Sequence, residues 1–160
     1  MNEMFGSYLL LYPNGVESEA MLLRDILLEA PIHRAEERKP SIEVVEIELA
    51  GKVPTFLIEA KKKLSDSDSN TVIFYDPRGS ISLIQVCRNF AQNCPQKHII
   101  YISEFKISRQ LVKGENITFI FLENFQSLTG QITKAVQDWS TNETLKRLEA
   151  RDEFLGTPPD

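Results

Sequence analysis

Five short apolar segments, each followed by a stretch with helical periodicity, constrain the fold of this chain more than any other feature. The predicted strands are residues 7–12, 42–49, 71–75, 97–102 and 117–122. The predicted helices are residues 17–30, 54–64, 80–93, a short 105–112, and 124–139. Strands that are apolar along nearly their whole length are typical of a parallel sheet with helices on both faces.

The order of these segments also predicts the topology of the sheet. Right-handed crossovers between parallel strands leave few arrangements, and the commonest one for five such units is the flavodoxin-like order 2-1-3-4-5. In that order the second strand lies at an edge, which suits the three glutamates of segment 42–49. We therefore predict an α/β three-layer sandwich with a five-stranded parallel sheet and one extra helix at the carboxyl terminus.

The domain organisation follows from length and from one capping signal. A chain of 160 residues can bury a single core without disulfides or metal. We assign residues 1–139 to one α/β domain. Residues Ser140–Glu143 match a capping box, which predicts a new charged helix ending near Phe154. Residues 140–160 are then a charged helix and a tail. The acidic segment 65–70 is too short to divide the domain.

Charge and hydropathy exclude some partners. The formal net charge of −5 argues against a nucleic-acid binder that depends on broad phosphate neutralisation. The amino-terminal apolar run is too short for a signal-peptide core, and no segment reaches the length of a membrane span. We expect a cytoplasmic protein that binds another protein or itself, without a membrane partner.

A candidate site follows from the predicted topology, because ligands in open parallel sheets bind at the carboxyl ends of the strands. The polar residues that follow the predicted strands are Asn14, Gly15, Asp76, Arg78, Gly79, Ser80, Ser103 and Glu104. An acid at the end of a central strand points to a ligand-binding role for Asp76. The alternative is a turn in which Asp76 bonds its own backbone. The start of the next helix, with Arg78 beside it, suits a phosphate or carboxylate.

The catalytic motifs that would name a reaction are missing. The sequence has no P-loop, no GxGxxG, no GxSxG and no HExxH. His33 falls in a charged loop and His98 begins a strand, so both suit structural or surface roles. We therefore assign no catalytic residue, no metal site and no cofactor.

The layout over residues 7–139 resembles the receiver domains of response regulators, and more closely their degenerate relatives, the pseudo-receivers. Asp76 followed by Pro77 ends the third predicted strand, and Ser103 ends the fourth. In receivers the matching residues are the phosphorylated aspartate and the hydroxyl that senses it. The resemblance thus implies a regulatory domain in signalling.

The chain also departs from the receiver pattern. Tyr12, Pro13 and Asn14 stand where the family has its acidic pair, and Glu123 follows the fifth strand near the place of its lysine. Magnesium needs several oxygen ligands beside an incoming phosphoryl group, and one aspartate is a poor cage. We expect no phosphotransfer at Asp76.

The preferred function is a non-catalytic regulatory or scaffolding domain that binds protein. The fifth strand carries no charge to protect a sheet edge, so either the helix from Glu143 or a partner is expected to cover it. The candidate face comprises Phe119, Phe121, Glu123 and Phe125. An alternative is a domain that binds or processes a phosphate or nucleotide ligand at the strand ends. A third is a subunit of an assembly whose catalytic residues lie elsewhere.

Overall fold

A computed structural model of the chain describes residues 7–28, 41–47, 69, 71–106 and 108–155. The strands are β1 (Ser7–Pro13), β2 (Ser41–Ile47), β3 (Thr71–Tyr75), β4 (His98–Ser103) and β5 (Ile117–Phe121). The helices are α1 (Glu17–Leu28), α3 (Ile81–Asn93), α4 (Ser108–Leu111) and α5 (Phe125–Leu155). The single turn of α4 is shorter than the predicted 105–112. The helix predicted over residues 54–64 lies outside the described residues.

The predicted topology is confirmed. The five strands form one sheet in the order β2-β1-β3-β4-β5, and every neighbouring pair is parallel. The glutamate-bearing strand β2 is at one edge as expected, with Glu43 and Glu46 exposed. The opposite edge is β5.

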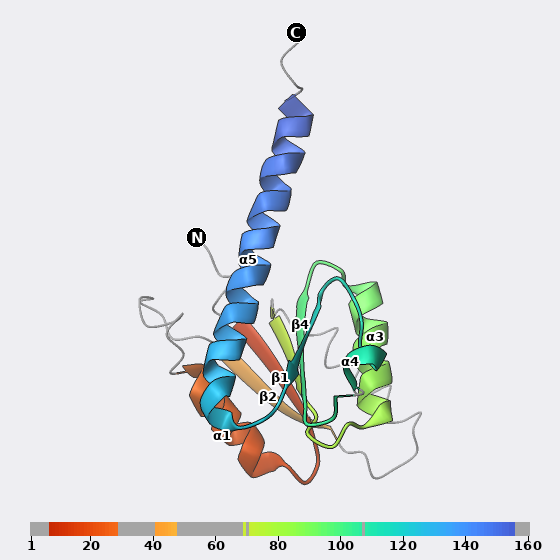
Figure 1. Cartoon of the computed structure of the whole chain (residues 1–160), viewed down its shortest axis with the longest axis vertical. Coiled ribbons are helices and arrows are strands. Elements are labelled where there is room, and N and C mark those ends of the chain that lie inside the picture. Colours follow the sequence, from red (N-terminus) through yellow and green to blue (C-terminus); the bar gives the residue numbers. More distant parts are fainter. Residues whose placement is uncertain (1–6, 29–40, 48–68, 70, 107, 156–160) are drawn as a thin grey trace.

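The sheet is the middle layer of a three-layer sandwich (Figure 1). Helices α1 and α5 cover one face, and α3 with the short α4 covers the other. Alternate residues of the central strands therefore enter different cores, since successive side chains on a strand point to opposite faces. Leu10, Ile73 and Ile100 pack towards α1 and α5, whereas Leu9 and Val72 pack towards α3. The three central strands are buried on both faces, which explains their apolar sequences.

The carboxyl-terminal helix differs from the prediction. We expected one helix to end near Trp139 and another to begin after the capping signal, but α5 runs without a break from Phe125 to Leu155. The boundary predicted at residue 140 thus falls inside a helix. The Thr144 hydroxyl donates a hydrogen bond of 3.0 Å to the Ser140 carbonyl, the acceptor one turn earlier in the same helix.

The last turns of α5 do not cover the edge of β5. The helix projects past the sheet, with residues 144–151 exposed along their length (Figure 1). We expected either the charged helix from Glu143 or a partner to cover the fifth strand. The helix does not cover it, because this part of α5 continues along the axis of its packed half and leaves the sheet.

Candidate functional site at the carboxyl ends of the strands

Asp76 lies directly after β3 and is completely buried. One carboxylate oxygen, Oδ2, accepts a hydrogen bond of 2.6 Å from the Ser80 backbone N–H and another from the Tyr101 hydroxyl. The other oxygen, Oδ1, has no hydrogen-bond partner among the described residues. The acid is thus enclosed by its own chain.

Burial raises the pKa of the Asp76 carboxyl above its ordinary value. The hydrogen bonds from Tyr101 and from the Ser80 and Gly79 backbone oppose that shift, because they stabilise the charged form. Burial and the nearby Asp76 carboxylate also raise the pKa of the Tyr101 hydroxyl, so Tyr101 is the donor of this pair. Tyr101 and Asp76 thus form an internal hydrogen bond between β4 and the turn after β3.

The segment after β3 is a tight turn. This is the alternative given by the sequence, in which Asp76 bonds the backbone of its own turn. The Gly79 N–H donates to the Asp76 carbonyl at 3.2 Å, and Gly79 has a φ of +68°. A Cβ at Gly79 would lie 3.1 Å from the Phe105 ring, so this backbone conformation and close approach both require glycine. Asp76 Oδ2 then caps the start of α3 by accepting from Ser80, whose own side chain makes no capping bond.

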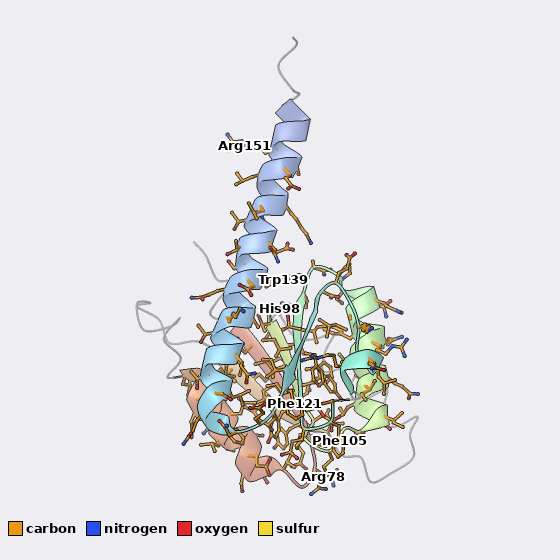
Figure 2. The ribbon with its side chains drawn as sticks, viewed as in Figure 1. Arg78, His98, Phe105, Phe121, Trp139 and Arg151 are labelled. Atoms are coloured by element: carbon orange, nitrogen blue, oxygen red, sulfur yellow. The ribbon has the colours of Figure 1, made fainter. Side chains whose placement is uncertain are left out.

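The loops that follow β1, β3 and β4 meet at this end of the sheet. A Cβ at Gly15 would be 3.9 Å from the Arg78 guanidinium, which places these two loops side by side. The Glu104 N–H donates to the Pro77 carbonyl at 3.4 Å. Arg78 is exposed, and Phe105 is half exposed beside the same turn (Figure 2). The Asn14 N–H donates a hydrogen bond of 3.0 Å to the Ile47 carbonyl, which extends the pairing of β1 with β2 by one residue.

Ser103 is buried, and its hydroxyl has a local partner. Its Oγ accepts a hydrogen bond of 3.2 Å from the Phe105 N–H, and its carbonyl accepts one of 2.9 Å from Leu122. Glu104, the next residue, is exposed. The structure therefore brings the predicted residues to one end of the sheet but fills the centre of that end with Asp76, Tyr101 and Ser103.

The aromatic residues predicted for an interaction face divide between the two sides of β5. Phe119 packs in the α3 core and stacks on Tyr101 with ring centroids 6.4 Å apart. Phe125 packs in the other core, with its ring 6.1 Å from that of Tyr75. Glu123 is exposed between β5 and α5. These residues form two surfaces on either side of a sheet edge.

Cations lie over the rings of β5, which the strand sequence does not reveal. The Lys106 ammonium is 5.2 Å from the centroid of Phe121, and the Arg109 guanidinium is 5.5 Å from that of Phe119. Both cations come from the segment around α4. They partly protect the aromatic side chains of the edge on the α3 side.

Two tyrosines at this end of the sheet were not among the predicted residues. Tyr101 bonds Asp76, and on the other face the Tyr75 hydroxyl donates to Glu19 of α1. A signal for them exists in the sequence, because a tyrosine in an apolar buried strand needs a partner for its hydroxyl. For Tyr101 the acceptor is the acid after the neighbouring strand, and for Tyr75 it is an acid of α1.

His98 has the structural role that its position at the start of a strand indicates. Its ring is buried, with Nε2 2.9 Å from the Thr118 hydroxyl and the ring stacked on Trp139 at 4.9 Å between centroids. Burial lowers the pKa of His98 to about 4, so the imidazole is neutral at physiological pH. His33 lies outside the described residues.

Comparison with known proteins does not assign the chain to a family. The chain matches no protein-family model and no curated protein. Within the described residues, no helix has both the length and the apolar character of a membrane span. The same residues contain no cluster of three or more acidic, histidine or cysteine side chains able to hold a metal ion.

Proposed function

We propose that this chain is a non-catalytic regulatory domain of the cytoplasm that works by binding another protein chain, in the manner of the pseudo-receivers it resembles. The observation that carries the proposal is the complete burial of Asp76, whose Oδ2 is occupied by Ser80 and Tyr101. A phosphoryl acceptor needs a carboxylate open to solvent and to a metal. Here the corresponding position serves to hold the α3 turn against β4.

The surroundings of Asp76 support the same conclusion. Tyr12, which stands where receivers have an acid, is itself buried. Burial raises the pKa of Asp76, which makes the charged form less stable than it is in water. The Ser103 hydroxyl accepts a bond from its own loop. Asp76 Oδ2 and the Ser103 hydroxyl thus both have structural partners within the chain.

The edge of β5 is the surface we propose for association. The Ile99 N–H bonds the Asn116 carbonyl, and the Leu122 N–H bonds the Ser103 carbonyl. Because backbone groups alternate along a strand, those of Phe119 and Phe121 point away from β4. The strand has no charged residue and its side chains are mostly half-buried. A partner strand that pairs here would complete the sheet.

Sedimentation velocity on the full chain tests this surface. We expect a concentration-dependent association, or a complex with the partner, that Phe121→Lys weakens by about tenfold or more, since a charge directed into an apolar contact is strongly unfavourable. Leu22→Lys is the matched control, because Leu22 is exposed on α1, away from β5. Equal behaviour of the two variants, with both folded by circular dichroism, would refute the proposed edge.

A thermal-shift panel of nucleotides and phosphorylated metabolites distinguishes the ligand-binding alternative. A ligand that binds only the folded state raises its melting temperature. We expect no saturable stabilisation. A stabilisation that Arg78→Ala abolishes would contradict a purely protein-binding role, because Arg78 is the exposed cation beside the α3 turn.

A further inference from the structure

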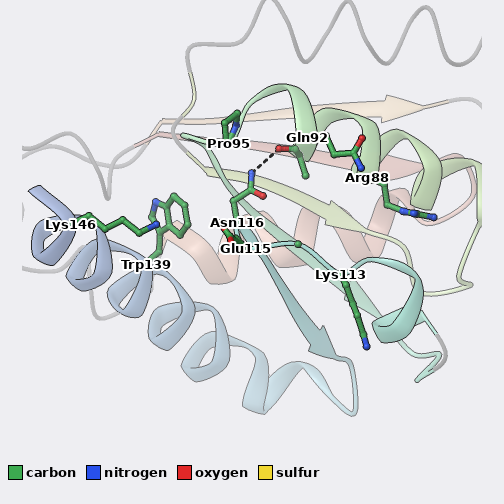
Figure 3. Close-up of a pocket in the computed structure, with 10 residues that line it drawn as sticks. Arg88, Gln92, Pro95, Lys113, Glu115, Asn116, Trp139 and Lys146 are labelled. Carbon is green, nitrogen blue, oxygen red and sulfur yellow. Dashed lines mark hydrogen bonds between the residues drawn. The ribbon is translucent and has the colours of Figure 1, made fainter. Parts of the chain in front are cut away.

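A surface pocket of about 320 Å³ lies at the amino-terminal ends of β4 and β5 (Figure 3). Asp76 lies at the other end of the sheet, after the carboxyl end of β3. Its walls come from the end of α3, the loop before β5 and the middle of α5. The side chains that matter below are Arg88, Lys113, Glu115, Asn116, Trp139 and Lys146. No part of this pocket overlaps the site at the carboxyl ends of the strands.

The charge of the pocket is opposite to that of the whole chain. Arg88, Lys113 and Lys146 are cationic, and Glu115 is the one acidic residue of the lining. The chain as a whole carries a formal net charge of −5. A local excess of positive charge in an acidic protein favours an anionic ligand at this place.

The floor of the pocket is held rigidly by Asn116. Its buried side-chain nitrogen lies 3.2, 3.1 and 3.0 Å from the carbonyls of Ala91, Cys94 and Lys97. These contacts fasten the start of β5 to the loop that joins α3 to β4. The pocket is therefore preformed, which lowers the entropy that a ligand must lose on binding.

Trp139 forms the apolar wall. Its indole stacks on the buried His98 ring with an interplanar angle of 6°, and the Lys146 ammonium lies 5.8 Å from its centroid. Lys146 also pairs with Glu143 at 3.5 Å, but its side chain is 64% exposed, so an incoming carboxylate can replace that partner. The half-buried indole offers an aromatic surface beside exposed cations.

The arrangement of the cations indicates the class of ligand. Arg88 and Lys113 are exposed and extend away from Trp139 in different directions, whereas Lys146 lies along the indole (Figure 3). A single phosphate is best held by donors that converge on one point. Cations spread over three elements suit several carboxylates distributed along an extended segment.

We propose that this pocket binds an acidic peptide segment of a partner protein, with carboxylates at Arg88, Lys113 and Lys146 and an apolar side chain against Trp139. This surface is separate from the edge of β5. The proposal for this pocket and the proposal for the β5 edge can therefore be refuted independently. We expect Phe121→Lys to leave peptide binding unchanged.

Trp139 makes the proposal directly measurable, because it is the only tryptophan in the chain. The probe is a fluorescein-labelled peptide of glutamates interrupted by one leucine, titrated with the full chain. We expect a saturable rise in anisotropy and, with the unlabelled peptide, a change in tryptophan emission. Both should weaken with added salt, since the contacts are exposed charge pairs.

The decisive variant is Arg88→Glu/Lys113→Glu, which we expect to weaken binding by about tenfold or more. Lys134→Glu/Arg151→Glu is the matched control, because it makes the same change of charge at two exposed residues outside the pocket lining. Equal weakening by both variants would overturn the proposal, as would equal binding of a glutamine version of the peptide. Tighter binding of an oligonucleotide than of the acidic peptide would also overturn it.

Discussion

At the scale of single residues, Asp76 shows how a buried acid can stabilise a turn. Its Oδ2 satisfies two donors, the Ser80 N–H and the Tyr101 hydroxyl, that would otherwise be without an acceptor. Asparagine offers a carbonyl oxygen at the same place, and alanine offers none. We expect Asp76→Ala to be less stable than Asp76→Asn by about 1–3 kcal/mol, because an unsatisfied buried donor is destabilising.

Urea denaturation of the two variants measures this difference, and its dependence on pH adds a second check. Because burial raises the pKa of Asp76, the folded state holds that proton more tightly than the unfolded state. The contribution of Asp76 to stability is therefore greatest below its unfolded pKa and declines as the pH rises through the folded pKa. Asp76→Asn should lose this dependence. Alanine and asparagine variants of equal stability would contradict the capping role.

His98 gives the opposite dependence on pH. Its pKa is lowered to about 4 in the folded state, against 6.5 for an unperturbed histidine. Its stabilising effect is thus complete above pH 6.5 and is lost as the pH falls towards 4. Between pH 7 and pH 4 we expect the parent chain to lose about 3 kcal/mol more stability than His98→Phe, as measured by urea unfolding. Parallel pH profiles would show that His98 is not buried as a neutral ring.

At the scale of secondary-structure elements, two glycines should respond in opposite directions to the same change. Gly79→Ala places a Cβ at a φ of +68° and against Phe105, and we expect a loss of about 1–2 kcal/mol. Gly130 is in the interior of α5 with nothing within 4 Å of a Cβ. Gly130→Ala should therefore gain about 0.5–1 kcal/mol through helix propensity. Thermal unfolding of both variants tests the pair, and a shared sign would contradict the turn geometry.

Elements were predictable where one local pattern determined them. The apolar runs of β1, β3 and β4 and the glutamates of β2 indicated central and edge strands, and the order of the sheet followed. The break predicted within residues 140–143 was wrong, because the capping-box sequence Ser140–Glu143 is also compatible with the interior of α5. A local pattern of this kind does not distinguish a helix start from a helix middle.

The position of the candidate site could be predicted from the sequence, but the burial of Asp76 could not. Parallel topology alone brings the loops with Gly15, Asp76 and Glu104 to one end of the sheet. Whether Asp76 faces solvent depends on the Tyr101 side chain from the next strand and on Phe105 over the turn. The pocket around Trp139 depends on three segments far apart in the chain, so periodicity within each segment gave no sign of it.

At the scale of the whole molecule, the two ends of the sheet have different properties. The carboxyl end is filled by the chain's own side chains, with Asp76, Tyr101 and Ser103 buried together. The amino end carries the cationic pocket. Helix α5 passes across one face and continues beyond the sheet, where Leu145 and Leu148 are half exposed (Figure 1). The proposed function uses the two exposed surfaces and assigns the buried carboxyl end a structural role.

The closed state of the carboxyl end can be tested by amide NMR of the full chain titrated with beryllofluoride and magnesium, a mimic of an acyl phosphate on aspartate. With Asp76 buried and bonded to Ser80 and Tyr101, we expect the amide resonances of Gly79, Ser80 and Glu104 to stay unchanged. Saturable shifts of these resonances that disappear in Asp76→Asn would show an accessible acid, and would contradict a domain that acts through its surfaces alone.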